Sequence, residues 1–97
     1  MYGLIGSFKA APGKRDELVA ILLSSVDAMP GCRSYVVAHD PADADVVWIT
    51  EVWDSPAAHK ASLDLPSVKA AIAKAMPLIA SFGEHRELQV VGGHGLG

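Results

Sequence analysis

The sequence contains very little cysteine, modest charge and no concentrated positive charge. Cys32 is the one cysteine among 97 residues, so no disulfide can form within the chain, which favours a reducing compartment. Charged residues make up 20% of the chain, the net charge is −3, and no cluster of Lys or Arg stands out. A nucleic-acid surface needs such a cluster to neutralise phosphates. We therefore expect a cytoplasmic protein without a nucleic-acid partner.

Long hydrophobic runs and metal-binding motifs are also missing. No apolar run approaches the ~18 to 20 residues that span a membrane, and the N-terminus lacks the basic start and apolar core of a signal peptide. The histidines, at positions 39, 59, 85 and 94, have no metal-ligand spacing. Phosphate-binding loops are absent as well. The sequence thus predicts no membrane partner and no metal site.

Hydrophobic residues, in contrast, make up 51% of the chain. That content is enough for one core, so residues 1–91 are expected to form a single domain, followed by a flexible tail at 92–97. It also leaves apolar surface for which a partner subunit is the natural cover.

Periodicity and turn signals divide the chain into strands and helices. Strands are predicted over 2–10, 32–39, 46–53 and 84–91. Helices are predicted over 14–29, over 56–63 after the capping residue Ser55, and from 66 to about 79. Pro77 should break the last helix near Met76. The order is β-α-β-β-α-β, a ferredoxin-like α+β fold with a four-stranded antiparallel sheet and helices on one face.

Alternation along the strand 46–53 gives the sheet two apolar faces. Val47, Ile49, Glu51 and Trp53 share one side, and Val46, Trp48, Thr50 and Val52 share the other. Helices would cover only one of these faces. We expect the other face, with Trp48, to be covered by a second copy of the chain, which gives a homodimer.

With this order of elements, several short motifs resemble the antibiotic biosynthesis monooxygenase (ABM) domain, a branch of the dimeric α+β barrel proteins. They are Pro12 and Gly13 before the first helix, Pro30 and Gly31 before the second strand, and the segment 51–55, EVWDS. The resemblance implies a homodimeric barrel with a pocket in each subunit between sheet and helices. It also implies oxidation of quinols, phenols or aromatic polyketides by O₂ without flavin or metal, although some members have no established activity.

The resemblance suggests roles for four residues, each with a structural alternative. Trp53 would line the substrate pocket, or serve as a core aromatic, and Tyr35 would bind a substrate oxygen, or pack half-buried. His59 would accept the substrate proton, or lie on a solvated helix face. Glu51, on the same face as Trp53, would orient His59 or relay its proton, or form an ion pair, for which Arg86 is the expected partner.

Departures from the family leave other functions open. Neither Ser62 nor Ser67 supplies the histidine that many members carry there, and Gly6 and Ile72 replace the asparagine and histidine of haem-degrading relatives. Haem degradation is therefore disfavoured. A cofactor-independent monooxygenase is the leading hypothesis. The alternatives are a non-catalytic protein that binds a small apolar ligand and a structural dimer.

Overall fold

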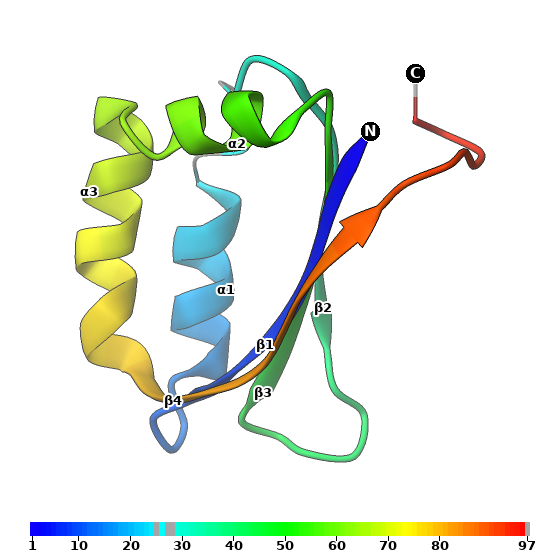
Figure 1. Cartoon of the computed structure of the whole chain (residues 1–97). Helices are drawn as coiled ribbons and strands as arrows, with labels where there is room; N and C mark the ends of the chain where they lie inside the picture. Colours follow the sequence, from blue (N-terminus) through cyan, green and yellow to red (C-terminus); the bar gives the residue numbers. More distant parts are fainter. Residues whose placement is uncertain (25, 27–28, 97) are drawn as a thin grey trace.

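The computed structural model describes residues 1–24, 26 and 29–96, which form one antiparallel sheet and a layer of helices (Figure 1). The elements follow the predicted order, with the second helical region divided into short helices. They are β1 (Tyr2–Ala10), α1 (Arg15–Leu23), β2 (Cys32–His39), β3 (Val46–Trp53), α2 (Pro56–Ser62), α3 (Pro66–Ala75), a 3₁₀ turn (Met76–Leu78) and β4 (Ile79–Gln89).

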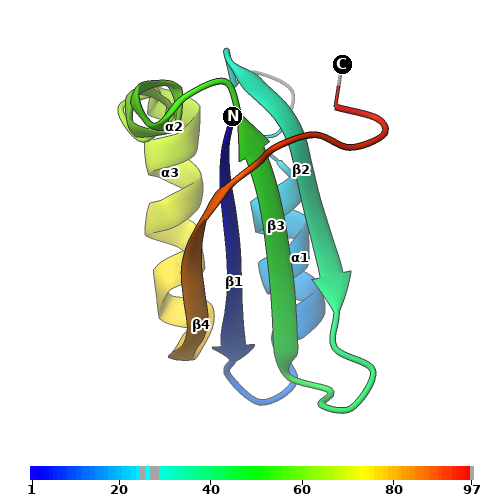
Figure 2. The ribbon, with the colours of Figure 1, turned by 45° about the vertical axis from the view of Figure 1, so that its right-hand side comes forward.

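The strands lie in the order β2-β3-β1-β4, and each neighbouring pair is antiparallel (Figure 2). All three α-helices lie on one side of this sheet (Figure 1). The ferredoxin-like α+β prediction is therefore confirmed. In the part of the chain that the structure describes, no helix is long and apolar enough to cross a membrane.

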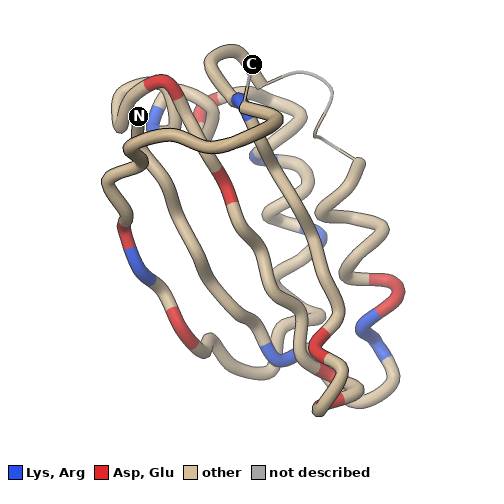
Figure 3. The backbone as a smooth tube through the Cα atoms, turned by 90° about the vertical axis from the view of Figure 1, so that its right-hand side faces the viewer, with Lys and Arg blue, Asp and Glu red and all other residues tan. Residues whose placement is uncertain are grey.

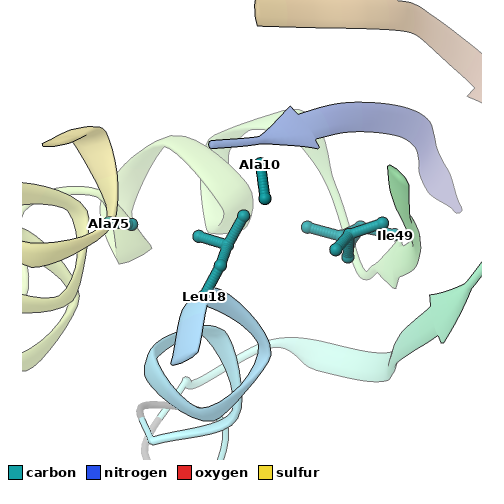
Figure 4. Packing of buried hydrophobic residues seen from close by; sticks show 5 residues of the cluster. Ala10, Leu18, Ile49 and Ala75 are labelled. Carbon is teal, nitrogen blue, oxygen red and sulfur yellow. The ribbon is translucent and has the colours of Figure 1, made fainter. Parts of the chain in front are cut away.

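The core fills the space between α1, α3 and the helix-facing side of the sheet. Leu18 of α1 and Val47 of β3 are fully buried there, and Ala10, Ile49 and Ala75 pack around them (Figure 4). Val47, Ile49 and Trp53 are all buried, as alternation along β3 predicts. The small side chains of Ala10 and Ala75 let α3 approach the sheet closely at this end.

Local signals set the start of α2 and the end of α3. Ser55 caps α2 by accepting a hydrogen bond from the Ala58 backbone N–H, at 3.1 Å. The predicted break at Pro77 is confirmed, because α3 ends at Ala75 and the chain continues as a 3₁₀ turn.

Two predicted boundaries were wrong by five or more residues. α1 ends at Leu23 instead of Met29. Ser24, the next residue, donates both its backbone N–H and its hydroxyl to the Ile21 carbonyl. Positions 25 and 27–28 of that predicted helix lie outside the described residues.

β4 begins at Ile79 instead of Glu84, so Ile79 belongs to a strand and not to the helix. Gly83 directly precedes the predicted strand, but in the structure it lies within β4, at an irregularity of the β1–β4 ladder. There, only a glycine leaves room for the Ser7 hydroxyl.

The side of the sheet away from the helices carries many apolar side chains. Trp48 and Val52 are half-buried there, and Val36 and Leu88 are 51% and 46% exposed. In a view from this side, charged residues along the middle strands are few (Figure 3).

Trp48 donates its indole N–H to Asp40 at 2.9 Å, and this hydrogen bond holds the pKa of Asp40 below its ordinary value.

Candidate functional site

A cavity of about 230 Å³ lies between the sheet and the helices α2 and α3. All four residues predicted for the site line it: Tyr35, Glu51, Trp53 and His59. The remaining lining is almost entirely apolar and comes from Phe8, Leu22, Met29, Ile49, Leu63, Val68, Ala71, Ile72, Ala75, Met76, Ile79 and Phe82, together with Ser62. A cavity of about 150 Å³ accepts benzene, so this one has room for a substituted aromatic ring.

Trp53 and Glu51 reach the cavity because β3 places them on its helix-facing side. Trp53 is 1% exposed, so it is both a core aromatic and a cavity wall. Its indole N–H donates a hydrogen bond of 3.0 Å to Glu51 Oε1. This hydrogen bond ties the carboxylate to the wall of the cavity and restricts its rotation.

His59 lies in the first turns of α2, directly after the strand end. Its Nε2 is 4.0 Å from Glu51 Oε1, and its side chain is 23% exposed. The imidazole meets the Trp53 ring nearly edge to face, with ring centroids 5.3 Å apart. Ser62 donates its hydroxyl to the His59 carbonyl at 2.6 Å, so this serine is occupied within the helix.

The expected ion pair between Glu51 and Arg86 was wrong. Arg86 pairs with Ile5 in the β1–β4 register, whereas Glu51 pairs with Leu4, and adjacent residues of β1 point to opposite faces. Arg86 lies 3.4 Å from Glu84 instead. Within the described residues, Glu51 therefore stays on the cavity side without a Lys or Arg partner.

Burial dominates the electrostatics of this carboxyl group. Desolvation raises the pKa of Glu51, while the Trp53 hydrogen bond and the nearby His59 and His85 act in the opposite direction. Glu51 in turn affects Tyr35, its neighbour across the β2–β3 ladder. Burial first, and then the Glu51 charge, raise the pKa of Tyr35, so its hydroxyl remains a hydrogen-bond donor throughout the physiological range.

Tyr2 is a site neighbour that sequence reasoning missed. Its ring lies 5.8 Å from the His59 ring, between centroids, and its hydroxyl donates to Glu87 at 3.1 Å. Tyr2 lies opposite Trp53 in the β1–β3 register. The sequence shows that Tyr2 belongs to a strand, but only the register places it against His59.

His39, His85 and Cys32 do not line the main cavity. His39 is exposed and 3.9 Å from Asp16, His85 is exposed on β4, and Cys32 is half-buried. Among residues 1–24, 26 and 29–96, no group of three or more His, Cys, Asp or Glu side chains could hold a metal ion.

The fold and this cavity define a small α+β protein with a mostly apolar cavity that a few polar groups also line. Residues 1–74 match the family described as antibiotic biosynthesis monooxygenase, and the chain belongs to that family. The family resemblance seen in the sequence is thereby confirmed. No curated protein matches the chain.

Solved structures agree with this assignment. A Chloroflexus aurantiacus protein, provisionally assigned as an antibiotic biosynthesis monooxygenase, is 64% identical with a TM-score of 0.97, covering 99% of this chain and 98% of its own. A Caulobacter crescentus protein with the same provisional assignment is 25% identical with a TM-score of 0.84, covering 94% and 90%. A Deinococcus radiodurans structure, 24% identical with a TM-score of 0.79 over 96% and 95%, shares the fold.

Proposed function

We propose that the chain is a cofactor-independent monooxygenase that oxidises a small aromatic quinol or phenol with O₂. The observation that carries this proposal is the placement of His59, Glu51 and Trp53 together at one end of an apolar cavity. An apolar ring would pack against Trp53 and the aliphatic wall. Its hydroxyl would meet the imidazole of His59 and the hydroxyl of Tyr35.

The reaction begins with removal of a proton from the substrate hydroxyl by His59. The resulting phenolate is electron-rich and transfers one electron to O₂, giving superoxide and a phenoxyl radical. These combine to form a C–O bond as a hydroperoxide, which loses water to leave a new carbonyl. For a quinol the balance is one quinol plus one O₂ giving one hydroxyquinone plus one water. The quinol supplies every electron, so no separate reductant is required.

In the proton-transfer step Glu51 would act through His59 and would not itself take the substrate proton. Its Oε1 stands 4.0 Å from His59 Nε2, close enough to orient the imidazole toward the substrate. The hydrogen bond from Trp53 limits the movement of this carboxylate. Tyr35, as a donor, would orient the substrate oxygen or stabilise its developing negative charge.

The test is oxygen consumption with a panel of quinols, comparing wild type with His59→Ala and Glu51→Gln. Loss of a general base should lower the rate by about 10²-fold or more in His59→Ala. His39→Ala is the matched control, because His39 is exposed and does not line the cavity. Equal rates in wild type and His59→Ala, including no rate above buffer in either, would refute the catalytic role.

The same cavity supports a second candidate function, the binding of a small apolar ligand without turnover. The apolar lining favours it, since a ligand could be held by that lining alone. Calorimetric binding of a quinol without oxygen consumption would favour this alternative.

We also propose that the helix-free face of the sheet forms a homodimer. Val36 and Leu88 on this face are about half exposed, and the half-buried Trp48 lies on β3, one of the two strands between theirs. An apolar sheet face of this kind is covered in stable proteins, and the family relationship makes a second copy the expected partner.

A further inference from the structure

Gly6 differs from the other glycines of the sheet because it lines a cavity, and a side chain there would meet only one backbone atom closely. A Cβ on Gly3 would lie 2.8 Å from Val90 Cγ2, and a Cβ on Gly83 would collide with the Ser7 hydroxyl. A Cβ on Gly6 would meet the Glu84 carbonyl at 3.3 Å, and no other atom of the described residues within 4 Å. Gly6 also has no positive φ angle, so its backbone does not require glycine.

Gly6 lines a side cavity of about 80 Å³. Gly6 lies in β1 between Ile49 of β3 and His85 of β4, and β1 runs between those strands (Figure 2). The side cavity shares part of its lining with the main cavity, namely Phe8, Ile49, Glu51 and Phe82. The two spaces therefore adjoin.

The walls of the side cavity combine apolar surface with a few hydrogen-bonding groups. Glu51 and His85 line it from β3 and β4. Ser7 and Glu84 also line it, but the Ser7 hydroxyl accepts the Glu84 backbone N–H at 2.9 Å, and the Glu84 carboxylate pairs with Arg86. The carboxylate of Glu51 makes this space unfavourable for an anion. Glu51 and His85 suit a small neutral group that both donates and accepts hydrogen bonds.

We propose that Gly6 determines substrate specificity by opening a subsite for a neutral, hydroxyl-bearing ring substituent that Glu51 and His85 recognise. This inference rests on the proposed function for the position of the ring, but it adds the class of substrate. The preferred substrate is an aromatic quinol with one substituent of a few heavy atoms, such as hydroxymethyl, beside the ring hydroxyl. A bare ring leaves the subsite to water, and a carboxylate substituent meets like charge.

The test measures anaerobic binding by calorimetry, with hydroquinone, 2-ethylhydroquinone and 2-hydroxymethylhydroquinone as probes. The last two have the same number of heavy atoms and differ in one hydroxyl. Wild type should bind the hydroxymethyl probe about tenfold more tightly than the ethyl probe, the value of about one good hydrogen bond. His85→Ala should remove this preference while leaving hydroquinone binding within about twofold.

Filling the subsite provides the second arm. Gly6→Val should weaken both substituted probes about tenfold or more while leaving hydroquinone nearly unchanged, and Gly6→Ala should have an intermediate effect. Gly92→Val is the matched control, because a Cβ at that position meets no atom of the described chain within 4 Å. Thermal melts check whether Gly6→Val remains folded. If it does not, Gly6→Ala takes its place in the comparison.

Uniform weakening of all three probes in the Gly6 variants, no change in any, or no binding of the substituted probes to wild type would overturn the subsite. Oxygen consumption, measured in parallel, tests the proposed function separately. Discrimination between the probes without oxygen consumption would retain the subsite and refute catalysis. Oxygen consumption without discrimination between the probes would support catalysis and refute the subsite.

Discussion

The two tryptophans of β3 allow a paired measurement of what the candidate site contributes to stability. Each donates its indole N–H to a carboxylate: Trp53 to Glu51 at 3.0 Å and Trp48 to Asp40 at 2.9 Å. Trp53 is 1% exposed and the Glu51 side chain 17%, whereas Trp48 and Asp40 are both half-buried at the surface. Substituting each tryptophan by phenylalanine removes the same chemical interaction from two different environments.

The expected loss for Trp53→Phe follows from the burial of both partners. A hydrogen bond to a charged group contributes about 1.5–3 kcal/mol, and the Glu51 side chain is only 17% exposed, so water cannot fully replace the lost donor. The smaller ring also removes about 40 Å² of buried surface, which adds about 1 kcal/mol. The free energy of unfolding should therefore fall by about 2.5–4 kcal/mol. Trp48→Phe should cost less, because water can solvate Asp40.

The size of the loss should also depend on pH. The Trp53 hydrogen bond favours the ionised form of Glu51, so without it the pKa of Glu51 rises further. Trp53→Phe should consequently lose more stability at neutral pH than at about pH 4, where the carboxyl group of the variant is protonated. Asp40 has a pKa below its ordinary value, and Trp48→Phe should show less change over this range.

Urea unfolding followed by far-ultraviolet circular dichroism measures both variants, at one protein concentration so that association does not bias the comparison. A loss of this size in a domain of about 100 residues lowers the midpoint of thermal unfolding by about 10 °C or more. A loss in Trp53→Phe no larger than in Trp48→Phe, or one independent of pH, would refute the reasoning.

Three further predictions concern the same elements. Burial raises the pKa of Glu51, so the stability that this group contributes is present at low pH and is lost as pH rises through that pKa. Glu51→Gln should therefore gain stability relative to wild type between about pH 4 and pH 8 in urea unfolding, and a constant difference would contradict this. Trp48→Glu should shift the protein from dimer to monomer or aggregate in light scattering, whereas a stable monomer of the unmodified chain at micromolar concentration would rule out the dimer. Haem should give only weak, nonspecific spectral change, since Gly6 and Ile72 supply neither a hydrogen bond nor an iron ligand, and a sharp Soret shift at one haem per subunit would overturn that view.

Periodicity in the sequence was sufficient for the fold and for the inward face of β3. Val47, Ile49, Glu51 and Trp53 alternate with residues of the opposite face, and the capping of α2 by Ser55 set the position of His59. These are local signals, contained within one strand or one helical turn. They are enough to direct Glu51, Trp53 and His59 toward the same cavity.

What the sequence could not supply was register between distant segments. Arg86 was assigned to the wrong face because a strand beginning at Ile79 and crossing an irregularity near Gly83 cannot be aligned with β1 from composition alone. The contact of Tyr2 with His59 and the space beside Gly6 depend on the same β1 pairings. Alternation predicts on which face of the sheet each residue of a strand lies, but the register between two strands is determined only in the assembled sheet.

Three of the polar groups of the cavity come from one short segment, residues 51–59, while most of its apolar lining comes from elements spread along the chain. The mutual positions of Glu51, Trp53 and His59 are therefore set by a single strand-to-helix turn and need no closure of a long loop. Changes in α3, β1 or β4 can reshape the apolar space without disturbing the distances among these three groups. The arrangement of these polar groups and the shape of the apolar space can therefore change largely independently during evolution or design.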